Sequence, residues 1–280
     1  VEIDYRQPNC LRSTVSTTSR HFPGGMLKPG ITFVTNQFGL RGSPEDSGHK
    51  EPLVVVVAGG DFVAGPSWSE EETLPALLKK RLKERVPSLD LRVVNFGHSG
   101  YNLEELNREF VRFVDRIRPD VTIVVLDEES GKGAACAAAS LPVRFFLTRH
   151  SALWGWLERH VGHYAPFNFG RGYSLRMDRT SIGVLMDGFS HPEQCRRPLF
   201  VFNGPIRLFN NSGFDSGGLD EVVRQKGYEV LDLSAEPVNM DDGGGPGNGS
   251  RTTRLVAEKI AERLLASGID QWFCEDGDTR

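Results

Sequence analysis

The sequence LVVVVAGGDFVAG, residues 53–65, begins with an uninterrupted Val-rich run and continues into a glycine-rich turn. An apolar run without polar alternation is typical of a strand that is buried on both faces, as in a parallel sheet. Gly59 and Gly60 permit a sharp backbone turn at the carboxyl end of this strand. Open α/β sheets bind their ligands at that end of the strands. The sequence therefore predicts that Asp61 lies at a functional edge.

Strand-like and helix-like segments alternate along the rest of the chain. Further strands are expected at residues 91–96, 121–126, 199–203 and 228–233. Helices are expected at residues 70–86, 102–118, 141–161, 219–226 and 250–266. This alternation indicates a parallel sheet with crossover helices. We therefore predict a three-layer α/β/α sandwich with a mostly parallel five-stranded sheet, flavodoxin-like in outline.

The helix expected at residues 70–86 has clear sequence signals. Ser69 is placed to cap its first turn, and three acidic residues follow where the helix dipole favours them. One side of the helix carries an apolar stripe typical of a surface helix. The stripe consists of Leu74, Leu77, Leu78 and Leu82.

The chain has 280 residues, which is long enough for one substantial hydrophobic core. We expect a lead-in at residues 1–50 that packs on the domain, one α/β domain at residues 51–268, and a tail at residues 269–280. The net charge of −4 gives no reason to expect a nucleic-acid partner. No apolar run is long enough to cross a bilayer.

The first residue and the cysteines bear on the compartment. The chain begins with Val rather than Met, so an upstream signal or anchor that has been removed would make the location extracytoplasmic. The four cysteines lack the spacing of a zinc site or a CxxC motif, which favours free or buried thiols and leaves a disulfide open. They are Cys10, Cys136, Cys195 and Cys274.

Four stretches in this order carry a resemblance to a known family. They are LKPGITFVTNQFGLRG (27–42), VVVVAGGDFVAGPSWSEEETLPALLKKRL (54–82), VVNFGHSGYN (93–102) and DDGGGPGNGSRTTRLVAEKIAERLL (241–265). They resemble the lead-in, the nucleophile turn with its helix, the second block and the closing block of bacterial SGNH, or GDSL-type, hydrolases. The resemblance covers most of the chain. It implies the α/β fold of that family and an acyl ester or acylated sugar as substrate.

The family's chemistry needs a serine nucleophile, a histidine base oriented by an aspartate, and oxyanion donors from a glycine and an asparagine. By the resemblance, the serine position is Asp61, the histidine position is Gly245, and the asparagine position falls at Glu129. Gly97 matches the oxyanion glycine, and Asp242 matches the aspartate of the closing Asp-x-x-His loop.

These substitutions predict that ester hydrolysis is lost or strongly impaired. The carboxylate of Asp61 has no hydroxyl proton for a base to remove, and Glu129 would place negative charge beside a developing oxyanion. No histidine follows His191 in the sequence, so the closing loop lacks a base. Loss of triad members leaves only a residual acceleration from binding and the oxyanion hole. We interpret the chain as a degenerate member of the family.

Two other interpretations stay open. In an active esterase or deacetylase, Asp61 would act as a covalent carboxylate nucleophile, and His98 or His191 would replace the missing base. In a ligand- or metal-binding module, the predicted fold gathers six carboxylates that would bind Ca²⁺ or Mg²⁺, although separately solvated acids are the simpler alternative. The six are Asp61, Asp127, Glu128, Glu129, Asp241 and Asp242. We expect no organic cofactor.

Overall fold

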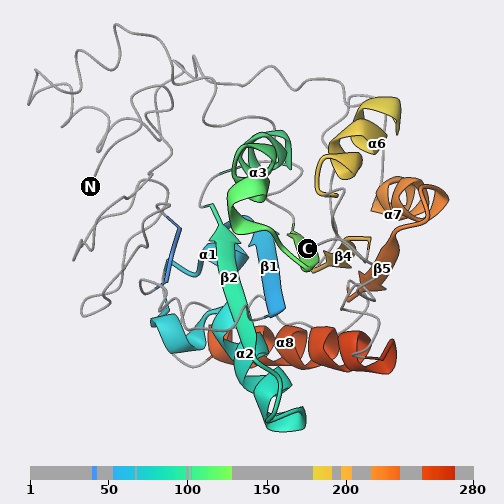
Figure 1. Ribbon diagram of the computed structural model, residues 1–280. Coiled ribbons are helices and arrows are strands. Elements are labelled where there is room, and N and C mark those ends of the chain that lie inside the picture. The colour runs from blue at the N-terminus through green and yellow to red at the C-terminus, as the bar shows by residue number, and fades with distance from the viewer. Residues whose placement is uncertain are drawn as a thin grey trace, which may run out of the picture.

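The computed structural model has a central sheet with helices on both faces (Figure 1). It describes residues 40–42, 53–66, 68–98, 101, 103–127, 179–190, 197–203, 216–233 and 248–268. The strands are β1 (Leu53–Gly59), β2 (Leu91–Gly97), β3 (Val121–Leu126), β4 (Leu199–Phe202) and β5 (Glu229–Asp232). The helical elements are α1 (Asp61–Ala64), the 3-10 turn η1 (Glu70–Glu72), α2 (Leu74–Arg85), α3 (Leu103–Ile117), α6 (Arg179–Asp187), α7 (Ser216–Gln225) and α8 (Asn248–Ala266).

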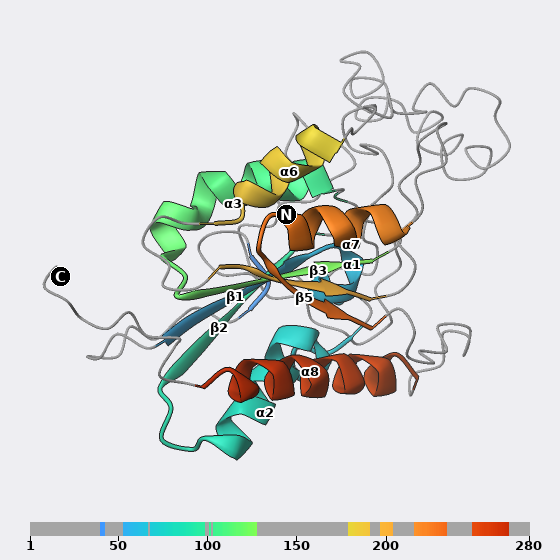
Figure 2. The same cartoon turned by 90° about the vertical axis from the view of Figure 1, so that its right-hand side faces the viewer.

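The sheet has five strands in the order β2-β1-β3-β4-β5, and every neighbouring pair is parallel. Figure 2 shows α3, α6 and α7 on one side of this sheet and α2 and α8 on the other. This three-layer arrangement with a 2-1-3-4-5 order is the doubly wound, flavodoxin-like type. The predicted fold class is confirmed.

The strand residues alternate between two apolar clusters. On one face, Val56, Phe96 and Phe200 belong to a cluster that includes residues of α3, α6 and α7. On the other face, residues such as Val57 and Ile123 pack with α2 and α8. All residues of β1 and β3 are buried, which explains why these strands are continuous apolar runs in the sequence.

The helix predicted at residues 70–86 is in fact divided. Ser69 forms a capping box with Glu72, but this caps the short turn η1 rather than the long helix. Thr73 is extended, and α2 begins after it with Pro75 in its first turn. Proline lacks an N–H and its ring clashes with the carbonyl four residues earlier, so a continuous helix through this point is disfavoured. Three leucines of the predicted stripe are fully buried, while Leu77 is partly buried.

Helix α6 was not expected from the sequence, and the bounds of several other elements differ from the predictions. No hydrophobic period marks the region that contains α6, whose Met186 is buried in the apolar cluster that includes residues of α3 and α7. The hydroxyl of Tyr228 and the ammonium of Lys226 donate to the Asp187 carboxylate at 2.6 and 2.7 Å. Helices α7 and α8 begin three and two residues earlier than predicted, since helix ends depend on local capping as well as pattern.

Some sequence predictions lie outside the described residues. They include the helix at residues 141–161, all four cysteines, His191, the tail, and the lead-in except residues 40–42. Leu40 and Arg41 are buried, so this described end of the lead-in packs on the domain. The domain limits stay a prediction. Among the described helices, none is long and apolar enough to cross a membrane.

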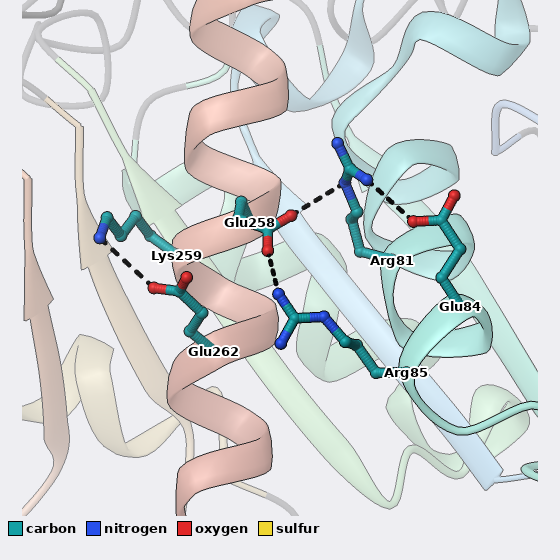
Figure 3. Close-up of polar contacts among 6 residues, drawn as sticks. All are labelled: Arg81, Glu84, Arg85, Glu258, Lys259 and Glu262. Carbon is teal, nitrogen blue, oxygen red and sulfur yellow. Dashed lines mark hydrogen bonds and ion pairs between the residues drawn. The ribbon is translucent and has the colours of Figure 1, made fainter.

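An ion-pair cluster connects α2 to α8 on the outer face of that layer (Figure 3). Glu258 accepts from Arg81 Nε at 2.9 Å and from Arg85 Nη2 at 2.6 Å. Arg81 also donates to Glu84 at 2.8 Å. Glu258 is thus the one carboxylate in Figure 3 that both arginines share.

We expect Glu258→Gln to lower the free energy of unfolding by about 0.5–1 kcal/mol, because exposed ion pairs contribute little each. The loss should shrink at high salt, where charges on the surface are screened. Urea denaturation at low and high salt measures both effects. Glu262→Gln, which removes a single exposed pair with Lys259, is the control and should cost less. A loss for Glu258→Gln that does not depend on salt would contradict this prediction.

Candidate functional site at the carboxyl edge of the sheet

The turn after β1 carries Asp61 as the first residue of α1. Gly59 is required here for close approach rather than for turning: a Cβ on it would lie 2.4 Å from Val63 Cγ2 and 2.9 Å from the Val125 carbonyl oxygen. Its backbone φ is not in the left-handed region, and neither is that of Gly60, whose φ is −82°. Gly65, which ends α1 at φ 60°, is the glycine that the backbone conformation demands. The two glycines therefore do not supply a left-handed conformation, and Gly60, at φ −82° and ψ −143°, lies outside the usual helical and extended regions.

Gly97, at the end of β2, lies directly against α1. A Cβ on it would lie 2.1 Å from the backbone nitrogen of Ala64 and 2.6 Å from the carbonyl carbon of Val63. Its N–H donates to Asn95 Oδ1 at 2.9 Å. Close packing of two backbones thus explains the glycine, and its N–H is engaged by a side chain of its own strand. A role for Gly97 as an oxyanion donor stays a prediction.

Arg41 holds the other end of α1. Its guanidinium donates from Nη1 to the carbonyl oxygen of Ala64 at 2.8 Å and to that of Gly65, and from Nη2 to that of Trp68 at 2.6 Å. The residue is 3% exposed. Burial lowers the pKa of Arg41 to about 10, against the opposing effect of the Glu70 and Glu71 carboxylates. It therefore remains charged at neutral pH. Sequence reasoning placed Arg41 in the resemblance but assigned it no role.

The order of the strands places the switch point of the sheet between β1 and β3, which are neighbours although β2 separates them in sequence. Ligands of doubly wound sheets bind outside the carboxyl ends of the strands at such a point. Asp61 follows β1 there, and Asp127 follows β3. A Cβ on Gly60 would lie 3.6 and 3.8 Å from the two carboxylate oxygens of Asp127. Asp127 is buried, so the edge carries a buried carboxylate beside the turn of Asp61.

Asn203 extends this polar row to the end of β4. Its backbone N–H donates to the Leu126 carbonyl oxygen at 2.8 Å, which continues the pairing of Leu126 with Phe202. Asn203 therefore follows β4 at the level where Asp127 follows β3, on strands spaced about 4.8 Å apart. The Asn203 side chain is fully buried, and neither its Nδ2 nor its Oδ1 has a hydrogen-bond partner among the described residues. A buried amide without partners is energetically unfavourable.

We expect Asn203→Leu to raise the free energy of unfolding by about 1 kcal/mol, because it removes two buried polar atoms that lack partners. Asn203→Asp should instead destabilise the protein, since it would bury a carboxylate close to Asp127. Equilibrium unfolding in urea compares both variants with the wild-type chain. A clear loss of stability in Asn203→Leu would contradict the prediction and would mean that the amide is paired in the folded protein.

His98 lies beside this edge but is part of an aromatic cluster. Its backbone N–H donates to the Gly59 carbonyl oxygen at 2.9 Å. Its ring stacks on Tyr101 with centroids 4.7 Å apart and meets the edge of Phe96 at 4.9 Å. The residue is 9% exposed. Packing thus accounts for the position of His98, and its role as a replacement base stays a prediction.

The structure brings together only part of the predicted site. Asp61, Gly97 and Asp127 lie at the same edge of the sheet. Glu129, Asp242 and Gly245, as well as Glu128 and Asp241, lie outside the described residues. Within the described ranges, no group of three or more His, Cys, Asp or Glu side chains is placed to hold a metal ion.

Comparisons with known proteins give matches only among solved structures. No protein-family model matches the chain, and no curated protein matches it significantly. Solved structures similar in fold include SGNH hydrolases. The lipase/acylhydrolase from Enterococcus faecalis is 11% identical, with a TM-score of 0.44 over 76% of this chain and 96% of that chain. AlinE4, an SGNH-hydrolase family esterase, is 14% identical, with a TM-score of 0.41 over 78% and 99%.

A third solved structure is the psychrotrophic esterase EstA from Pseudoalteromonas sp., which is 10% identical, with a TM-score of 0.44 over 79% of this chain and 98% of that chain. At such identities and TM-scores, none of the three structures carries an argument about the activity or the ligand of this chain. Any inference about the activity or the ligand has to be based on the strand order and on the residues at the carboxyl edge of the sheet.

Proposed function

We propose that this chain is an SGNH-hydrolase-like protein in which the hydrolysis of acyl esters is lost or strongly impaired. The observation that carries the proposal is the position of Asp61, the first residue of α1 at the tip of the fully buried strand β1. By the sequence resemblance, the nucleophilic serine would stand there. By the same resemblance, Glu129 stands in place of the asparagine that donates to the oxyanion, and Gly245 stands in place of the histidine base.

The chemical reason is the charge of the edge. Acyl transfer needs a deprotonated nucleophile and donors aimed at the oxygen on which negative charge develops. Asp61 offers a carboxylate in place of a hydroxyl, and the buried Asp127 brings a second carboxylate beside the same turn. A developing oxyanion at this place would be repelled rather than stabilised.

A fluorophosphonate probe tests the proposal without knowledge of the natural substrate. An activated serine attacks the phosphorus, the new oxygen–phosphorus bond forms, and fluoride leaves, so the protein gains the mass of the phosphonyl group. We expect intact-mass spectrometry to find no adduct on the wild-type chain. An adduct that maps to a serine at the carboxyl edge would overturn the proposal, and an active esterase treated in parallel controls for the probe.

A divalent-cation-binding module is the second candidate, and the proximity of the Asp127 carboxylate to the turn of Asp61 favours it. Oxygen ligands of this kind suit Ca²⁺ and Mg²⁺. Calorimetry and thermal melting with each ion test this candidate, because a ligand that binds only the folded state raises the melting temperature. The absence of both a heat of binding and a shift in melting temperature would exclude this candidate.

A further inference from the structure

We infer that Arg41 is a positioning residue for the candidate site and fixes the turn that presents Asp61. The inference depends on the proposed function only in taking this turn as the site. It concerns how the chain holds the turn in place, whatever chemistry Asp61 performs. The resemblance included Arg41 in a lead-in motif, but the structure shows what its side chain contacts.

Arg41 provides hydrogen-bond donors for the end of α1. A helix leaves its last carbonyl groups without partners inside the helix, and they need other donors. Arg41 donates to the carbonyl oxygens of Ala64 and Gly65, which close α1, and to that of Trp68 just beyond it. One planar guanidinium thereby binds three carbonyl groups across the turn. A lysine ammonium is a point donor and lacks this fork geometry.

The end of β2 constrains the same turn as Arg41. Gly97 allows the end of β2 to approach Ala64 so closely that a Cβ would overlap the backbone. Both Arg41 and β2 therefore contact the carboxyl-terminal end of α1. Burial of a charged guanidinium is unfavourable unless it is hydrogen-bonded, and here its two terminal nitrogens donate to three carbonyl oxygens.

Two backbone hydrogen bonds connect the residues that Arg41 contacts to Asp61 and to Gly60 before it. The N–H of Gly65 donates to the Asp61 carbonyl oxygen at 2.8 Å, and the N–H of Ala64 donates to that of Gly60 at 2.9 Å. The Ala64 carbonyl that accepts from Arg41 and the Gly65 N–H that donates to Asp61 belong to one peptide group, so Arg41 binds the group that fixes the backbone of Asp61. Loss of the guanidinium should loosen α1 and the placement of the Asp61 carboxylate.

Residue-resolved hydrogen exchange tests this inference. We expect the amides of Val63, Ala64 and Gly65 to exchange at least about tenfold faster in Arg41→Met than in the wild-type chain, because local opening of α1 becomes easier. Arg41→Lys should show most of this increase. Millimolar guanidinium added to Arg41→Ala should slow exchange at the same amides, since it restores the missing donors.

Ile260→Ala is the matched control, because Ile260 is fully buried in α8 and its loss lowers global stability. Exchange should be compared under conditions in which Arg41→Met and Ile260→Ala have the same free energy of unfolding. Equal acceleration of the α1 amides in the two variants would overturn the inference, as would guanidinium without any effect. If Arg41→Met does not fold, Arg41→Lys carries the same comparison. None of these readouts depends on hydrolysis, so failure here is distinct from failure of the proposed function.

Discussion

Gly97→Ala is expected to lower the free energy of unfolding by about 3 kcal/mol or more, at the upper end of the range for overpacked sites. The alanine Cβ would lie 2.1 Å from the nitrogen and 2.5 Å from the Cα of Ala64. Both are backbone atoms of α1, so the clash cannot be relieved by a change of rotamer. Either β2 or α1 must move. Equilibrium urea denaturation measures the loss.

Gly183→Ala makes the same chemical change in α6 and serves as the control. Its Cβ would meet only the end of the Lys226 side chain, at 2.8 Å from Cε, and that side chain can move. Alanine is also favoured over glycine in a helix by about 1 kcal/mol. We therefore expect Gly183→Ala to be neutral or stabilising. Equal losses in the two variants would contradict the contact proposed between Gly97 and α1.

Phe96→Ala is expected to lower the free energy of unfolding by about 3–5 kcal/mol, the usual range for a buried phenylalanine. Phe96 is fully buried on β2 beside the candidate site. Its ring lies 5.5 Å from that of Phe110 and 6.3 Å from that of Phe113, both on α3. It also contacts the His98 ring edge-to-face. The variant thus loses the contacts that join β2 to α3 and support His98.

Val111→Ala in α3 is the control for this prediction, because Val111 is 51% exposed and its truncation leaves little cavity. We expect a change within about 0.5 kcal/mol for this variant. Urea denaturation followed by far-ultraviolet circular dichroism compares the two. A loss below about 1 kcal/mol in Phe96→Ala would contradict the packing described for this cluster.

The sheet could be predicted from the sequence because its strands are buried on both faces. The runs at residues 53–59 and 121–126 contain no polar alternation that would suggest a half-exposed strand. The parallel direction of the strands follows from their regular alternation with helices. Periodicity is a local signal, and these elements are locally well specified.

Helix α6 and the break before α2 could not be predicted in this way, because neither is caused by a local apolar pattern. The packing of α6 is long-range: its Met186 is fully buried in the apolar cluster that includes residues of α3 and α7. The break before α2 depends on an extended Thr73 next to Pro75, which a broad apolar stripe conceals.

In the candidate site, too, local features could be predicted from the sequence and long-range contacts could not. Asp61 follows directly from the strand and turn pattern. The contacts of Arg41 with α1 and the level shared by Asp127 and Asn203 could not be predicted, because they depend on which strands are neighbours and on residues more than 20 positions apart.

Hydrolysis of a short-chain nitrophenyl ester, by the wild-type chain and by Asp61→Ala, tests most directly whether this edge of the sheet still performs ester chemistry. We predict no turnover above background in either protein. Turnover in the wild-type chain that Asp61→Ala abolishes would contradict the loss of activity and make Asp61 the catalytic nucleophile.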